Sequence, residues 1–427
     1  MSASWSPAAG ATGSTLSHLE GGLSGERYPA DELANLDPVD GKPLLARYDL
    51  DRAAGKLTRE TLASRRNGGL WRWAEILPVR RWEAVLTLGE GGTPLLPAPR
   101  LGRRFGVADL LIKSDSLNPT GSFKARGMAA AVSRAAELGA TRFVAPSAGN
   151  AGGALAAYAA AAGARATIVM PADAPTANQI EVVACGADLV LLDGLITDCG
   201  RLARSIADEL GAFDLSTLKE PYRVEGKKTM GLELAEDLGW TLPDAVIYPT
   251  GGGTGLVGMW KAFDELEQLG LIDGHRPRMF SVQAQGCAPI VRAFETGAEF
   301  APPWEDAATA AGGLRVPGAV GDFLILRCLR ESGGGALALP DDELFATQRV
   351  VGGFGAGYLS LETAAAVAAV PHLLTQGAIE RDDRVVIFDT GAGFKSDPPR
   401  DYTPPRPVAN DVDAWGDVIE RLRKPPA

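Results

Sequence analysis

Short apolar runs alternate with longer helical stretches between Leu110 and Thr390. The runs are rich in β-branched residues, as buried strands are, and cover residues 142–146, 166–170, 187–192, 244–250 and 383–390. The helical stretches cover residues 151–162, 196–210, 228–238 and 256–269. This alternation predicts an α/β fold whose parallel sheets are covered by helices on both faces. Ligands in such folds bind at the carboxyl ends of strands, so we expect the chemistry in the loops there.

The two ends of the chain lack this pattern. Residues 1–16 are rich in Ser, Ala, Gly and Thr, and five prolines occur in residues 396–407. We therefore expect a disordered tail over residues 1–16 and a proline-rich tail over residues 396–427. Residues 17–50 are turn-rich and predict an accessory module in front of the α/β core.

Composition narrows the class of protein. The 427 residues include 42 Lys and Arg against 53 Asp and Glu, a net charge of −11. An acidic chain without a dense basic run is a poor partner for nucleic acid. The first residues lack the order of a signal peptide, and no apolar stretch reaches the length of a membrane span. We expect a cytoplasmic protein with no membrane partner, free cysteine thiols and, as the commonest oligomer, a homodimer.

One loop carries a candidate reactive lysine. Residues 118–127 read NPTGSFKARG and open a helix, with Ser122 as the expected N-cap. Lys124 then lies in the first turn, where the positive end of the helix disfavours an ammonium group. A lysine kept neutral forms imines. Taken alone, the pattern also fits an exposed surface lysine.

Three further loops follow strands. Asn150 lies in a turn of small residues, Gly251–Gly255 form a candidate phosphate cradle before a helix, and Thr390 offers a neutral hydroxyl at the last strand. Residues 253–258 also spell G-x-G-x-x-G, but the next strand ends in Gln283 instead of the acid of a dinucleotide site. A lysine, an amide, a phosphate cradle and a hydroxyl together describe pyridoxal phosphate as the cofactor.

These loops, together with LGEGGTPLL at residues 88–96, resemble those of the fold-type II pyridoxal-phosphate enzymes, which are tryptophan synthase beta-like, and within them threonine synthases and their paralogues. The resemblance implies a large lobe of residues 51–125 and 222–395, a small lobe of residues 126–221, and the cofactor in the cleft between them. It implies that Lys124 binds the cofactor and moves protons, and that Thr390 faces the pyridine nitrogen. The other cofactor contacts that it implies are Phe123, Asn150, Gly251, Gly252, Gly253, Thr254 and Gly255.

The resemblance also implies a small amino-acid substrate. A threonine synthase converts O-phosphohomoserine and water to L-threonine and phosphate, and needs a site for the substrate phosphate. The residues assigned to substrate binding are Thr93, Ser147, Thr217, Lys219 and Arg223. A solvated charged turn is the alternative for residues 216–229. Elimination, as in serine and threonine dehydratases, or β-replacement, as in cysteate synthase, remain alternative reactions, and a non-catalytic paralogue is a third.

Some relatives carry a zinc ribbon at the N-terminus, built on two C-x-x-C pairs. The equivalent positions here are Gly21, Ser24, Asp37 and Asp40. Glycine has no ligand atom, so we predict a degenerate ribbon without metal over residues 17–50.

Overall fold

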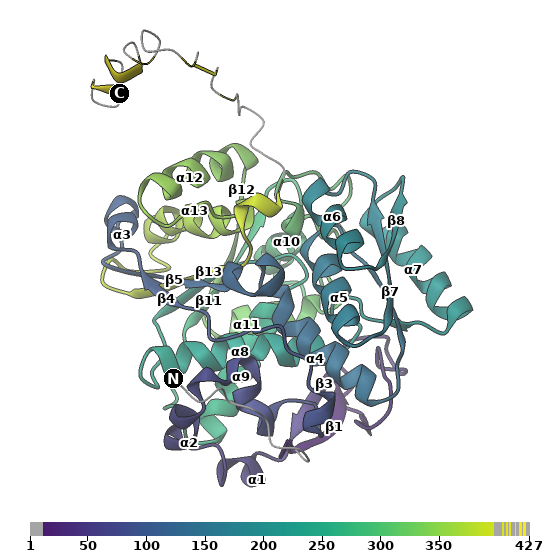
Figure 1. The fold of residues 1–427 in the computed structure, drawn as a ribbon. Coiled ribbons are helices and arrows are strands. Elements are labelled where there is room, and N and C mark those ends of the chain that lie inside the picture. The colour runs from purple at the N-terminus through teal and green to yellow at the C-terminus, as the bar shows by residue number, and fades with distance from the viewer. Residues whose placement is uncertain are drawn as a thin grey trace. The chain divides into compact units, whose positions relative to one another are not determined.

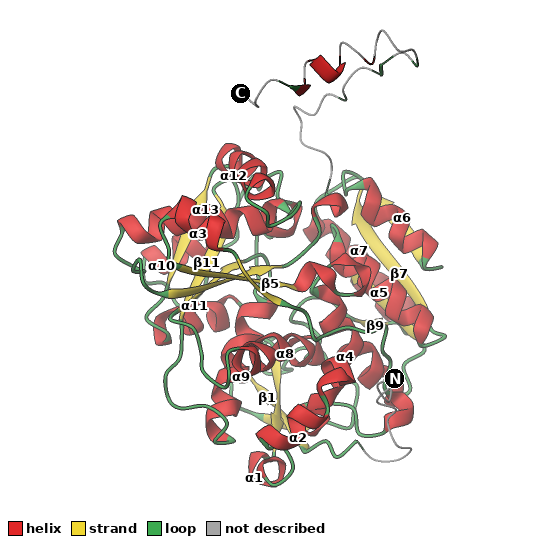
Figure 2. Cartoon of the chain, turned by 60° about the vertical axis from the view of Figure 1, so that its left-hand side comes forward, coloured by secondary structure: helices red, strands yellow, loops and turns green. Residues whose placement is uncertain are grey.

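Alternate side chains of the central strands face two different cores. In the computed structural model, β10 (Ala245–Pro249) directs Val246 and Tyr248 toward one core and Ala245 and Ile247 toward the other. This period of two is the strand geometry that a sheet buried on both faces requires. Helices α8 (Tyr222–Asp237) and α9 (Thr254–Gln268) cover the first face, and α13 (Leu361–Thr375) covers the second (Figure 2).

The larger sheet has six strands in the order β12-β11-β10-β13-β5-β4. The strand β4 is antiparallel to β5, and every other neighbouring pair is parallel. Its remaining strands are β4 (Leu95–Pro97), β5 (Asp109–Ser114), β11 (Arg278–Ala284), β12 (Gly335–Leu339) and β13 (Arg384–Asp389). The other helices around it are α3 (Pro99–Phe105), α10 (Pro289–Glu295), α11 (Asp322–Glu331) and α12 (Asp341–Gly353).

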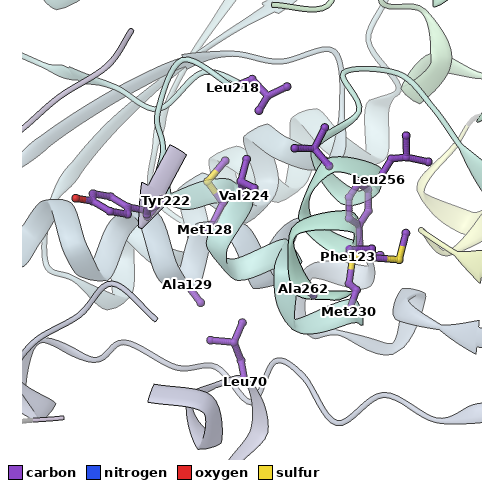
Figure 3. Close-up of a cluster of buried hydrophobic side chains, with 14 of the residues drawn as sticks. Leu70, Phe123, Met128, Ala129, Leu218, Tyr222, Val224, Met230, Leu256 and Ala262 are labelled. Atoms are coloured by element: carbon purple, nitrogen blue, oxygen red, sulfur yellow. The ribbon is translucent and has the colours of Figure 1, made fainter. Parts of the chain in front are cut away.

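The second parallel sheet has four strands in the order β8-β7-β6-β9, as Figure 1 shows in part. Its elements are β6 (Arg142–Pro146), α5 (Asn150–Ala161), β7 (Arg165–Pro171), α6 (Thr176–Ala184), β8 (Asp188–Leu192), α7 (Ile196–Leu210) and β9 (Phe213–Asp214). The helix α4 (Lys124–Glu137) packs against both α5 and α8. It therefore joins the four-stranded sheet to the helices under the six-stranded one. Figure 3 shows part of the shared core, including Phe123, Met128 and Leu256.

The predicted α/β fold with two parallel sheets is confirmed, and most predicted elements agree with the structure to within two residues. The exception is α8, which begins at Tyr222, six residues before the predicted start at 228. The reason is a side-chain cap, because the buried carboxylate of Glu220 accepts hydrogen bonds from the N–H groups of Tyr222 and Arg223 at 3.0 and 2.8 Å.

The predicted ribbon is a three-stranded antiparallel sheet in the order β2-β1-β3, formed by β1 (Leu16–Gly21), β2 (Arg27–Pro29) and β3 (Leu44–Tyr48). We call residues 12–49 the N-terminal module. Its β3 strand packs on α8. Residues 12–15, part of the predicted tail, are ordered, because Thr12 and Thr15 hydrogen-bond to the backbone of Arg80 and Glu75. Short elements follow at α1 (Leu50–Ala54), α2 (Arg59–Ser64), η1 (Arg66–Ile76) and η2 (Trp82–Ala84).

Polar side chains take the place of a metal centre in the ribbon. Asp37 is 1% exposed and accepts hydrogen bonds from the hydroxyls of Ser24 at 2.5 Å and Tyr28 at 2.6 Å, and from the N–H of Val39 at 2.8 Å. A Cβ atom on Gly21 would lie 2.1 Å from Asp37 Oδ2, so the carboxylate occupies the space that a side chain at residue 21 would need. Within the described residues, no group of three or more His, Cys, Asp or Glu is placed to hold a metal ion.

The structure describes residues 12–396 and separate positions between 404 and 423, which fall into two units. The predicted tails therefore lie largely outside the described residues. In the part described, no helix is both long and apolar enough to cross a membrane. The four cysteines are free thiols, and three of them are buried.

Replacing Asp37 with Ala should lower the free energy of unfolding by about 1–3 kcal/mol, because buried donors lose their acceptor. Burial raises the pKa of the Asp37 carboxyl, but the hydrogen bonds from Ser24, Tyr28 and Val39 outweigh it and hold the pKa below its usual value. A lowered pKa stabilises the fold above the unfolded pKa of about 3.9 and loses that effect as the pH falls. Urea unfolding at pH 7 and below pH 4 should show the difference between wild type and variant shrink in acid. A constant difference would contradict the ionised state of Asp37.

Candidate active site

Lys124 is the first residue of α4, at the carboxyl side of β5, as the sequence predicts. The prediction that Ser122 caps this helix is wrong. Phe123 holds the N-cap position, and Ser122 Oγ has no hydrogen-bond partner among the described residues. Ser122 has an extended backbone that pairs with Gly391, and Phe123 already has helical backbone angles, so the helix begins without a side-chain cap.

The amine of Lys124 has an unusually low pKa. Burial is the main cause, the positive charge of Arg223 adds to it, and the carboxylate of Glu362 opposes it, so that the pKa falls from 10.5 to about 7. The Nζ atom lies 4.1 Å from the centre of the Phe123 ring. A substantial fraction of the amine is therefore neutral at physiological pH, as imine formation requires.

The loops that carry Lys124, Asn150 and Thr390 meet at one place. The N–H of Phe123 donates to the carbonyl of Thr390 at 3.1 Å, next to the pairing of Ser122 with Gly391. A Cβ on Gly391 would lie 3.1 Å from Asn150 Nδ2. Asn150 Oδ1 is buried and has no hydrogen-bond partner within residues 12–396. The predicted amide and hydroxyl therefore lie beside the lysine loop, and the amide is free to bind another molecule.

The glycine loop between β10 and α9 presents free backbone donors. No described residue accepts a hydrogen bond from the N–H groups of Gly251, Gly252 or Gly253, and α9 begins directly after them at Thr254. Unpaired N–H groups at the start of a helix bind anions such as phosphate. Side chains are excluded there, because a Cβ on Gly251 would lie 2.2 Å from the carbonyl oxygen of Gly313, and Gly253 has a φ of 77°.

The ring of Tyr248 lies next to this glycine loop. Tyr248, on β10, packs edge-on against Phe123 with ring centres 6.1 Å apart. Its hydroxyl is buried without a hydrogen-bond partner in the described part of the chain, and a Cβ on Gly255 would lie 2.0 Å from it. The ring therefore connects the lysine loop with the phosphate cradle.

Arg223 lies close enough to lower the pKa of Lys124, and most of its donors are unused. Its side chain is 1% exposed, and Nη1 donates to the carbonyl of Leu215 at 2.7 Å. Nε and Nη2 have no acceptor among the described residues. Burial lowers the pKa of Arg223 to about 10, against the opposing charges of Glu220 and Asp214. A buried guanidinium with free donors is suited to binding an anionic group.

The other residues predicted to bind the substrate phosphate lie on the same loop. Thr217 is half-buried, and its methyl carbon lies 2.7 Å from the position of a Cβ on Gly252, directly beside the cradle. Lys219 is also half-buried, but its Nζ lies 3.5 Å from the carboxylate of Asp214. Lys219 thus has a counter-charge within the protein, whereas Arg223 keeps unused donors.

The hydroxyl of Ser147 hydrogen-bonds to the backbone of its own loop. Its hydroxyl donates to the carbonyl of Gly149 at 2.9 Å and accepts from the N–H of Gly152 at 2.8 Å. These bonds form the turn that leads into α5 and so place Asn150. The side chain of Ser147 therefore acts on the site through the shape of this turn.

A buried cluster of charged side chains fixes the position of the lysine loop through Arg126. Arg126 is fully buried, and its nitrogens donate to Asp115 and Glu233 at 2.7–2.8 Å and to the hydroxyls of Thr93 and Thr229 at 2.9–3.0 Å. Burial raises the pKa of Glu233, but Arg126 and Lys113 outweigh it and hold that pKa far below its usual value. Thr93, predicted to bind substrate, has its hydroxyl donating to Asp115 at 2.7 Å in this cluster.

Sequence reasoning missed two charged residues near Lys124. Glu362 lies in the first turn of α13, accepts a hydrogen bond from the N–H of Gly313 at 2.7 Å, and is the carboxylate that raises the pKa of Lys124. Lys227 is fully buried and donates to the carbonyl of Lys124 at 3.2 Å. Glu362 follows a Ser at the start of an alanine-rich helix, a capping pattern that marks a helix start but says nothing of a cleft.

These residues fit pyridoxal phosphate. The free N–H groups of Gly251–Gly253 suit its phosphate. The buried side-chain oxygen of Asn150 has no partner in the described part of the chain, and the amine of Lys124 is neutral enough to bind an aldehyde. Buried polar groups are normally hydrogen-bonded, so several unpaired ones around a single lysine indicate a place for a polar ligand.

Comparison with known proteins agrees with this chemistry. The family model "Pyridoxal-phosphate dependent enzyme" matches residues 86–391. Threonine synthase of Methanocaldococcus jannaschii is 32% identical over 401 residues, which are 94% of this chain and 98% of that protein. Threonine synthase of Methanosarcina acetivorans is 35% identical over 75% of this chain and 79% of its own length.

The fold has counterparts among solved structures. The structure of maize serine racemase superposes with a TM-score of 0.62 and covers 78% of this chain and 92% of its own, at 20% identity. That likeness supports the fold alone. With the family match and the identities above, the chain belongs to the fold-type II pyridoxal-phosphate-dependent enzymes, as a lyase of the threonine synthase family.

Proposed function

We propose that the enzyme converts O-phosphohomoserine and water to L-threonine and phosphate. The observation that carries the proposal is Arg223, a buried guanidinium with unused Nε and Nη2 donors beside the amine of Lys124. The name shared by its curated relatives supports the same reaction. A cytoplasmic homodimer is part of this proposal.

The roles of the residues follow from their placement. When bound, pyridoxal phosphate supplies an electron sink that eases removal of the Cα proton of an amino acid. Lys124, as a neutral amine, accepts that proton and returns protons later in the reaction. Arg223 donates to the substrate phosphate and holds it as it leaves, with Thr217 beside it. Thr390 would offer a neutral hydroxyl to the pyridine nitrogen of the bound cofactor.

Elimination or β-replacement on a related amino acid is the second candidate. The pairing of Lys219 with Asp214 favours it, because a single unpaired cation binds a phosphate less strongly than two. The products distinguish the reactions. A 2-oxo acid with ammonia indicates elimination, and a new β-substituted amino acid indicates replacement.

Replacing Arg223 with Ala should raise the KM for O-phosphohomoserine about 10- to 100-fold, because hydrogen bonds to a charged group contribute about 1.5–3 kcal/mol. The matched control is Lys219→Ala, on the same loop, for which we expect a smaller change. Phosphate release and threonine formation measure the reaction, and the cofactor absorbance should stay that of wild type in both variants. Lys124→Ala should lose that absorbance and all turnover. An unchanged KM in Arg223→Ala would remove Arg223 from the substrate site.

Two substitutions should move the pKa of Lys124 in opposite directions. Only the neutral amine reacts, so the rate at which apoenzyme binds added pyridoxal phosphate should rise with pH through about 7 and then level off. Arg223→Ala removes a positive charge and should shift this midpoint to higher pH, whereas Glu362→Gln removes a negative charge and should shift it to lower pH. Absorbance at several pH values measures both, and shifts in the same direction would contradict the assigned charges.

A further inference from the structure

The N-terminal module reaches the loop that precedes α8. We call residues 214–221 the anion loop, because Thr217 and Lys219 lie in it and Arg223 follows it. The side-chain Nδ2 of Asn35 donates to the carbonyl of Asp214 at 2.8 Å, and makes a longer contact of 3.5 Å with the carbonyl of Lys219. A single amide therefore connects the first and the sixth residue of this loop.

A second contact holds the end of the same segment. The hydroxyl of Tyr222 donates to the carbonyl of Ala30 at 2.9 Å, and Arg134 of α4 donates to that carbonyl at 2.8 Å. Residues 30–35 thus contact the first turn of α8 through Ala30 and the anion loop through Asn35. These residues connect β2 to β3 in the module, and none of them lies in a strand.

The anion loop has a backbone that needs such support. Leu218 adopts a φ of +58°, a left-handed conformation that a bulky side chain rarely takes. Strained residues of this kind persist only where the surrounding structure fixes them. Leu218 is 2% exposed, and Figure 3 shows it in the same buried cluster as Tyr222 and Val224. The loop is thus held by the apolar contacts of Leu218 and by the hydrogen bonds that Asn35 donates to its backbone.

The position of the anion loop determines where the free guanidinium lies. The carbonyl of Leu215 is the one acceptor that the guanidinium of Arg223 has within residues 12–396, at 2.7 Å from Nη1. Leu215 follows Asp214, which Asn35 holds. Thr217 of the same loop abuts Gly252 of the phosphate cradle. Movement at Asp214 would therefore move both the acceptor of Arg223 and the neighbour of the cradle.

We propose that Asn35 is a positioning residue for the substrate-anion site, acting through the anion loop on Arg223. This inference rests on the proposed function, since it takes Arg223 as the group that binds the substrate phosphate. It gives the N-terminal module a role in the active site that needs no metal.

The test compares Asn35→Ala and Asn35→Asp with wild type, in the full-length holoenzyme. Both variants remove the amide donor. Aspartate also places a negative carboxylate against the carbonyl oxygens of Asp214 and Lys219, so Asn35→Asp should show an effect at least as large as that of Asn35→Ala. Asp40→Ala is the matched control, because Asp40 accepts one hydrogen bond within the module, from the N–H of Lys42 at 2.8 Å, and has none to the anion loop. Arg223→Ala serves as the positive control for the site.

Two measurements are needed. Hydrogen exchange should become faster at the amides of residues 215–219 in both Asn35 variants and stay unchanged in Asp40→Ala. The inhibition constant of inorganic phosphate should rise about five- to tenfold in the Asn35 variants, as expected for one lost hydrogen bond, and further in Arg223→Ala. In the Asn35 variants, the kcat and the cofactor absorbance should stay near those of wild type.

The outcomes separate the two ideas. If Arg223→Ala weakens phosphate inhibition while the Asn35 variants do not, the positioning role is wrong and the proposed function survives. If exchange in the anion loop is unchanged in the Asn35 variants, the role is also wrong. If phosphate inhibits neither wild type nor any variant, the proposed substrate site fails, and the role assigned to Asn35 fails with it.

Discussion

The buried guanidinium of Arg126 is the interaction on which the active site depends. Its donors are shared between Asp115, just after β5, and Glu233, in the C-terminal half of α8. Glu233 also accepts a hydrogen bond from the N–H of Gly92 at 2.9 Å. Losing one partner of such a buried cluster leaves an uncompensated charge, at a cost of about 3–5 kcal/mol. Arg126 follows Lys124 by two positions. Its cluster thus holds four segments in one arrangement: the lysine loop, α4, α8 and the loop at residues 90–93.

Two opposite charges act on Lys124, a lysine that must stay partly neutral. Arg223 lies on the α8 side of Lys124 and Glu362 on the α13 side, and the two act on its pKa in opposite directions. Without the carboxylate of Glu362, burial and Arg223 would lower the pKa of Lys124 further, and the amine would take up a proton less readily. The opposing carboxylate keeps the pKa near neutrality, which suits a group that both accepts and returns protons. A general base works best when its pKa lies near the working pH.

Elements whose backbone is determined by neighbouring residues could be predicted from the sequence. The run at residues 142–146 and the four candidate loops could be recognised because β-branched runs and glycine-rich turns restrict the backbone directly. The start of α8 was misplaced, because its cap is a glutamate side chain in front of a proline. Ser122 was misassigned as a cap, and its backbone instead forms an isolated bridge with Gly391, 269 residues later in the chain.

Contacts between distant residues were not predictable in this way. Arg126 and Glu233 are 107 positions apart, and charged residues are mostly exposed, so nothing in either neighbourhood signals that they meet. The same holds for Glu362, whose place beside Lys124 follows from how α13 packs on the sheet. Thr93 and Ser147 were predicted to bind substrate from their residue type and their loops, but their hydroxyls hydrogen-bond to neighbouring protein groups.

The long separation between Asn35 and Asp214, 179 positions, has a consequence for how the chain matures during synthesis. The N-terminal module leaves the ribosome well before the anion loop and α8, which carry the groups that it docks on. A ribbon that binds a metal folds around ligands that are close in sequence. This module instead buries its surface partly through contacts with residues far away in the sequence. Its docking therefore belongs among the last steps of folding, and the nascent chain must keep the edges of its small sheet from pairing with other chains until then.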